Sequence, residues 1–164
     1  MKAGRILAAM ALLVGATSVA TAQTATQTVT FAVNAINRIS VSGPASLTVN
    51  TATAGSQPTD AVSSGITWAI TSNQANQKVT AELTAASGGD MPSGLTLTAS
   101  MAQPTGANTD GAQSLSTTPV RLVNSITRVA QSGLALTLTL SANVSAGTVS
   151  STTRDILYTI TTGP

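Results

Sequence analysis

The chain has 164 residues, with seven Lys and Arg, five Asp and Glu, no His and no Cys. The lack of histidine excludes Ser-His-Asp and Cys-His catalysis and removes the commonest metal ligand, while the lack of cysteine excludes disulfides. Charged residues make up 7% of the chain and aromatic residues 2%, so the clustered basic face that nucleic acid binding requires is not expected.

The first 22 residues are predicted to be a signal peptide. A short basic stretch precedes an apolar run at residues 6–19, and the small residues Ala20 and Ala22 fit a signal-peptidase site with cleavage before Gln23. The alternatives are a retained anchor and a pilin-type leader cut after Gly4. The run is shorter than the ~20 residues that span a bilayer, and no acidic residue lies just after Gly4, which weakens the pilin-type alternative. We therefore expect a secreted protein, located extracellularly, at the cell surface or in the periplasm.

Residues 23–164 are expected to form a single domain without a transmembrane segment. Lys2 and Arg5 leave with the leader, and the five basic and five acidic residues that remain give a net charge of zero. The apparent basicity of the whole chain is therefore no sign of a nucleic acid partner. So few charges leave sheet edges poorly protected against association with other strands.

The mature chain opens with a polar leash and a candidate strand. Val29, Phe31 and Val33 alternate with small or polar residues after the leash at residues 23–27, which predicts a strand. The alternation slips at residues 34–37, which predicts a bulge or kink. Such a strand can pair within its own domain or add to the sheet edge of a neighbouring copy. Val29, Phe31 and Val33 are therefore the candidate strand-exchange residues.

Further along the chain, period-two alternation predicts several more strands. They fall at residues 39–41, 47–49, 66–70, 79–83, 95–101, 134–140 and 156–160, with a short one at Leu115. Loops rich in Gly, Pro, Ser and Thr separate them, and one of these ends in Asp110-Gly111, a favoured hairpin pair. Residues 120–129 have partly helical spacing of their apolar side chains, which predicts a short helix or 3₁₀ turn there.

The clearest stretch is the leucine strand at residues 134–140. Leu134, Leu136, Leu138 and Leu140 occupy every second position, with Ala or Thr between them. A strand places these leucines on one face, whereas a helix would scatter them. Eight to nine such short strands and no long amphipathic helix predict an all-β fold, an antiparallel β-sandwich of immunoglobulin-like or jelly-roll-like type. A closed barrel is the alternative.

No catalytic, cofactor-binding or metal site is expected, so the chain is not predicted to be an enzyme. Trp68 alternates with Ile66 and Ile70, which favours a core position over a sugar-stacking platform. Lys78, the one lysine of the mature chain, begins an alternating strand and is expected to be solvated rather than to activate a serine. A calcium loop at residues 108–111 is a weaker interpretation than a simple turn.

The export leader ending Ala-Thr-Ala-Gln, the strand at residues 29–33 and the Thr/Ser-rich sandwich without His or Cys resemble secreted bacterial surface proteins of the pilin-like and spore-coat-U-like type. The disulfide that chaperone-assembled pilins often contain is missing. The resemblance implies a structural role in a fibre or coat, with self-association as the partnership, and it carries over no site residues. The alternative is an extracellular binding module that holds a glycan or a surface protein through loops such as residues 51–64 and 87–94.

Overall fold

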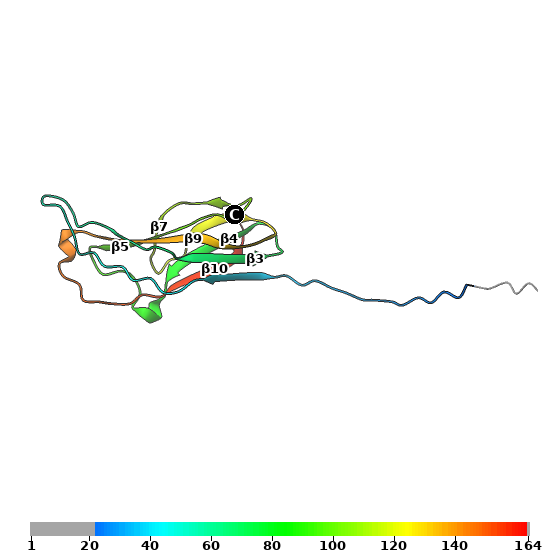
Figure 1. Ribbon diagram of the computed structural model, residues 1–164. Helices are drawn as coiled ribbons and strands as arrows, with labels where there is room; N and C mark the ends of the chain where they lie inside the picture. The colour runs from blue at the N-terminus through cyan, green and yellow to red at the C-terminus, as the bar shows by residue number, and fades with distance from the viewer. Residues whose placement is uncertain (1–21, 164) are drawn as a thin grey trace, which may run out of the picture. The chain divides into compact units, whose positions relative to one another are not determined.

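The computed structural model describes residues 22–163 (Figure 1). The predicted signal peptide lies outside the described residues except for Ala22. The chain divides into two units, Met1–Val33 and Asn34–Pro164. In the described part of the first unit, residues 22–33 form neither strand nor helix. All the strands belong to the second unit, which is an antiparallel β-sandwich as predicted.

The first sheet has six strands in the order β1-β3-β9-β5-β7, with β2 also paired to β9. Its strands are β1 (Asn37–Val41), β2 (Ala61–Val62), β3 (Thr67–Ser72), β5 (Leu95–Met101), β7 (Gln113–Ser114) and β9 (Val129–Ala142). The long strand β9 organises this sheet, because β3 pairs with its first half and β5 with its second half. The predicted leucine strand is therefore the centre of the sheet.

The second sheet has four strands in the order β10-β4-β8-β6. Its strands are β4 (Gln77–Leu83), β6 (Asn108–Thr109), β8 (Val120–Ile126) and β10 (Ile156–Thr162). Two short 3₁₀ turns, η1 (Ala85–Ser87) and η2 (Val144–Ala146), lie in the connections. Among residues 22–163, no helix is long and apolar enough to cross a membrane.

The core lies between the two sheets and follows the predicted alternation. Leu134, Leu136 and Leu138 are buried, and the residues between them on β9 are more exposed. Trp68 is only 1% exposed, and its indole Nε1 donates a hydrogen bond to the carbonyl oxygen of Ala102 at 3.2 Å. These side chains face the inner side of β4 and β8, where Val79 and Leu122 are fully buried.

The structure corrects the prediction of a helical turn at residues 120–129. This stretch forms β8 and the start of β9. Leu122 and Val123 are both buried although they are adjacent, because the pairing of β8 with β4 shifts register beside Val79. Ser125 also has a positive φ of 58°. A bulged strand breaks the period of two, and the resulting spacing resembles that of a helix.

Three smaller predictions are also wrong. Residues 29–33 and residues 47–49 are not strands, although Leu47 packs partly against the core. Asp110 and Gly111 do not close a hairpin, because the flanking strands β6 and β7 belong to different sheets. Gly111 instead adopts a positive φ of 74° where the chain crosses from one sheet to the other.

Candidate functional site

Each sheet has an edge strand on the same side of the sandwich. β1 pairs only with β3, and β10 pairs only with β4, so within residues 22–163 no strand covers the outer edge of either. The two edge strands approach each other. Unpaired edges expose rows of backbone donors and acceptors that can accept another strand.

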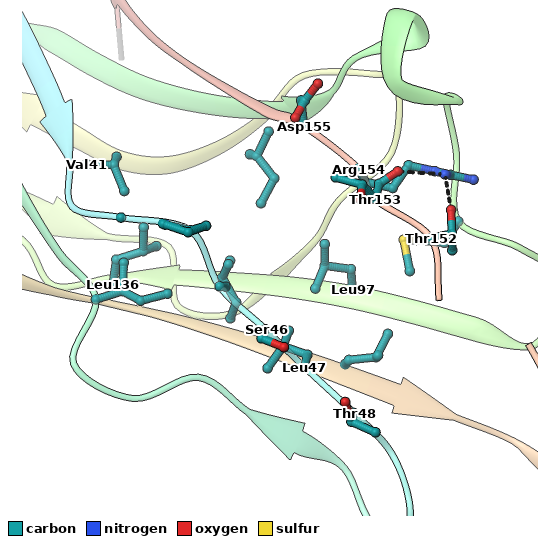
Figure 2. Close-up of a pocket in the computed structure, with 18 of the residues that line it drawn as sticks. Val41, Ser46, Leu47, Thr48, Leu97, Leu136, Thr152, Thr153, Arg154 and Asp155 are labelled. Atoms are coloured by element: carbon teal, nitrogen blue, oxygen red, sulfur yellow. Dashed lines mark hydrogen bonds between the residues drawn. The ribbon is translucent and has the colours of Figure 1, made fainter. Parts of the chain in front are cut away.

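An apolar groove lies beside these two edge strands, since Val41 of β1 and Ile156 and Tyr158 of β10 line it. Leu97 of β5 and Leu136 of β9 form its floor (Figure 2). Leu138 and Leu140 of β9 also belong to the lining. The cavity volume is about 590 Å³, which corresponds to about 20 waters at the ~30 Å³ that each occupies in the liquid. The space is therefore large enough to take several apolar side chains.

The groove reaches into the core. Among the buried side chains, Leu97 and Leu138 in its lining remain 8% and 6% exposed, whereas Ala99 and Met101, further along β5, are at 0%. The second sheet contributes Ile156 and Tyr158 of β10 to the lining. At this place Leu47 and Met91, from irregular segments, pack against the core together with Ile156 and Tyr158 of β10.

Two irregular segments form the rims of the groove. Residues 43–48 follow β1, and residues 151–155 lead into β10 (Figure 2). The second rim is held by Arg154, whose guanidinium donates to the carbonyl oxygens of Ser87 and Asp90, both at 3.3 Å. Arg154 also donates to Thr152 Oγ1 at 2.9 Å. The rim is therefore attached to residues 87–90 by these hydrogen bonds.

Tyr158 is the one titratable side chain of β10 in the groove wall. Burial raises the pKa of its phenol from 10.0 to about 12. The phenol is neutral over the ordinary pH range, so the wall of the groove is uncharged at this point. Arg154 and Asp155 are the charged residues of the lining, and both belong to the rim.

The candidate strand-exchange residues are all exposed. Val29 is 69% exposed, Phe31 88% and Val33 80%. They are the three most exposed large apolar residues of residues 22–163 apart from Val144. Isolated exposed apolar residues are common, but three at alternate positions of one segment form a continuous apolar stripe when the chain is extended.

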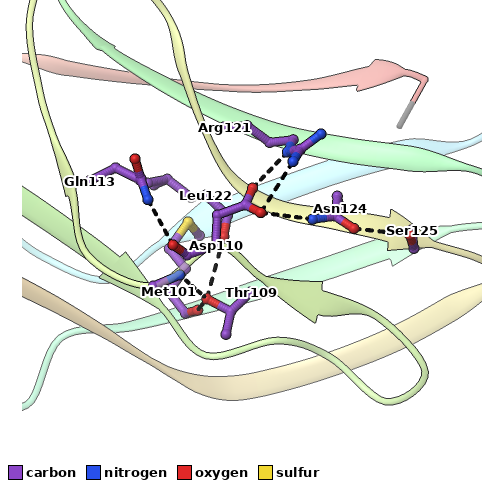
Figure 3. A network of polar contacts seen from close by, with 9 residues as sticks. Met101, Thr109, Asp110, Gln113, Arg121, Leu122, Asn124 and Ser125 are labelled. Atoms are coloured by element: carbon purple, nitrogen blue, oxygen red, sulfur yellow. Dashed lines mark hydrogen bonds and ion pairs between the residues drawn. The ribbon is translucent and has the colours of Figure 1, made fainter.

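The weaker calcium interpretation falls on a network of protein contacts (Figure 3). The carboxylate of Asp110 accepts hydrogen bonds from Arg121 Nε at 2.6 Å and from Asn124 Nδ2 at 3.0 Å. The hydrogen bond and the charge of Asp110 raise the pKa of Arg121 above its ordinary value. Residues 22–163 contain no group of three or more Asp, Glu, His or Cys that could hold a metal ion.

The two remaining candidates do not form a site. Trp68 is enclosed in the core, so its indole face cannot stack on a sugar. Lys78 is a half-buried residue of β4, and the groove lies elsewhere. The sequence prediction missed the groove because its rims, residues 43–48 and 151–155, are about a hundred residues apart, and the alternation at residues 47–49 indicates a strand rather than a groove.

No protein-family model, no curated protein and no solved structure matches this chain.

Proposed function

We propose that this protein is a secreted structural subunit of a surface fibre or coat, whose copies join by β-strand addition. Residues 28–33 of one copy lie beside β10 of the next copy and place Val29, Phe31 and Val33 in its groove. The observation that carries the proposal is the coexistence of an exposed apolar segment and an apolar groove beside an unpaired edge strand.

The two partners are matched in length and chemistry. Six extended residues span about 20 Å, close to the length of the seven-residue strand β10. Residues 28–33 carry no charge, and the floor of the groove is formed by leucines. Strand addition uses main-chain hydrogen bonds for affinity and pockets for alternate side chains for specificity, and both are available here.

β10 is the edge that fits the incoming strand better. It is longer than β1 and supplies Ile156 and Tyr158 to the wall of the groove, whereas β1 supplies only Val41. Each copy has one such segment and one such groove. A contact of this head-to-tail kind that does not close into a ring produces a filament.

The proposal is tested by assembly of the mature protein, which begins at Gln23. We expect multimers in sedimentation and fibres or sheets in electron microscopy, and we expect both to disappear when residues 23–34 are removed. Phe31→Asp should reduce assembly at least tenfold, because it places a carboxylate in an apolar groove. Thr30→Asp is the matched control, since residue 30 faces away from the groove in an extended strand and should permit assembly.

The opposite outcome would contradict the fibre proposal. Uniform monomers at all concentrations, together with retention on a glycan array, would replace the fibre proposal with the alternative of an extracellular binding module.

A further inference from the structure

We propose that Asn73 directs the N-terminal segment to a second copy of the chain, by holding residues 34–36 extended so that the segment does not enter the groove of its own domain. This inference rests on the proposed function and adds the selection of the partner.

Asn73 acts on the backbone that precedes β1. Its carboxamide oxygen Oδ1 accepts a hydrogen bond from Ile36 N at 2.8 Å, and its Nδ2 donates one to Asn34 O at 2.8 Å. Its own backbone N donates to Ile36 O at 3.2 Å. One side chain therefore bonds residues 34 and 36 together, as a further residue of β3 would.

These bonds require an extended chain. Backbone groups of residues two apart point to the same side in a strand, and a turn would point them to different sides. The pairing of β1 with β3 joins Asn37 to Ser72, and the bonds of Asn73 continue that pairing toward the N-terminus. Residues 34–36 therefore prolong the line of β1.

The groove lies toward the opposite end of β1. It is lined by Val41 and by residues 43–48, whereas Asn34 and Ile36 precede the other end of the strand. To place residues 28–33 in the groove of the same domain, the chain would have to reverse direction within residues 34–36. That reversal breaks the bonds that Asn73 makes, whereas donation to another copy leaves them intact.

The side chain of Asn73 and the start of β1 are held in place by hydrogen bonds with uncharged neighbours. Gln74 Nε2 donates to the Oδ1 of Asn73 at 2.5 Å. Ser72 Oγ donates to Asn37 Oδ1 at 2.7 Å, and Asn37 Nδ2 donates to Gln77 Oε1 at 3.2 Å. These hydrogen bonds attach the start of β1 to both sheets. The direction in which the N-terminal segment leaves the domain is therefore set by the folded domain itself.

The test compares the full mature chain with Asn73→Ala and with a matched control, Asn34→Ala. The control keeps the Asn34 carbonyl that Asn73 contacts and removes only the Asn34 side chain. Light scattering after size-exclusion chromatography gives the fraction of monomer. We expect Asn73→Ala to raise the ratio of monomer to multimer about tenfold, as the loss of two hydrogen bonds implies, and Asn34→Ala to match the wild type.

A second readout separates positioning from simple loss of stability. Monomers of Asn73→Ala should not bind a labelled peptide of residues 23–34, because their own residues 28–33 occupy the groove. A merely destabilised monomer would still bind it. Should Asn73→Ala fail to fold, Asn73→Asp replaces it. The aspartate keeps an acceptor for Ile36 N and loses the donor to Asn34 O. We expect an intermediate monomer fraction, and we expect these monomers also not to bind the peptide.

Assembly of the folded Asn73 variants at the wild-type level, or monomers of them that bind the peptide, would overturn the role of Asn73 and leave the proposed function standing. A wild-type protein that neither assembles nor, after truncation, binds the peptide would overturn both.

Discussion

Gly94 and Ala146 lie backbone against backbone: a Cβ on Gly94 would be 2.8 Å from both the Cα and the N of Ala146. Gly94 also has a φ of +80°, and its carbonyl oxygen accepts a hydrogen bond from Asn143 N at 2.9 Å. The loop before β5 is therefore closely packed on the turn η2 that follows β9, at the end of the sandwich where the groove opens.

This contact predicts that Gly94→Ala lowers the free energy of unfolding by about 3 kcal/mol, as a backbone clash adds to left-handed strain. Gly106→Ala is the control, because Gly106 has a similar φ of +79° and nothing within 4 Å of its Cβ position. It should lose only about 1 kcal/mol. Urea unfolding measures both, and equal losses would show that the contact with Ala146 is not tight.

The two faces of β9 should differ sharply in tolerance. Leu136→Asp places a carboxylate in the core, where Leu136 is 3% exposed, and the cost of several kcal/mol should abolish folding of a domain whose stability is ~5–15 kcal/mol. Leu134→Asp and Leu138→Asp should behave in the same way. Thr137→Asp, on the other face, should be much milder. Circular dichroism and yield of soluble protein report the difference, and equal tolerance of the two faces would contradict the sandwich.

Tyr158 should make the protein sensitive to alkali. Its pKa is about 12 in the folded state against 10.0 as the ordinary value, so the folded state holds the proton more tightly. The stabilisation is complete below about pH 10 and is lost as the pH rises toward about 12, by at most about 1.4 kcal/mol per pH unit. Tyr158→Phe should remove this decline. A steep decline that persists in the variant would assign it to another group.

Chelators and reducing agents should leave the melting temperature unchanged. The chain has no cysteine, and the loop carboxylates Asp110 and Asp90 make protein contacts, Asp110 with Arg121 and Asp90 with the backbone N of Thr117 at 2.7 Å. Differential scanning calorimetry with and without EDTA tests this. A large drop in EDTA would point to a calcium site and would make Asp90 and Asp110 the first residues to mutate.

The strands that the sequence predicts well are those with one buried face and one more solvent-exposed face. In β5 the inner positions alternate with Thr or Ser, and in the leucine part of β9 they alternate with Ala or Thr, so periodicity located both strands, although β9 begins earlier than predicted. The prediction failed at β8, because a bulge there places Leu122 and Val123 on the same side. A local shift of register depends on the partner strand, and the sequence of one strand does not contain it.

Of the candidate site, only the N-terminal apolar segment could be predicted from the sequence. The apolar stripe of Val29, Phe31 and Val33 is visible in the sequence, and it implies a strand that needs a partner. Alternation does not say which sheet supplies that partner, and the structure leaves the stripe exposed. The groove and the hydrogen bonds of Asn73 to residues 34 and 36 depend on segments distant in the chain, so they can be recognised only in the folded structure.

The most direct test of strand addition is binding of a synthetic peptide of residues 23–34 to a protein that lacks those residues. The account predicts saturable one-to-one binding by isothermal titration calorimetry, with a negative heat-capacity change from buried apolar surface. A peptide carrying Phe31→Asp should bind at least tenfold more weakly than one carrying Thr30→Asp. No binding of the unmodified peptide to a truncated protein that remains folded would contradict the account.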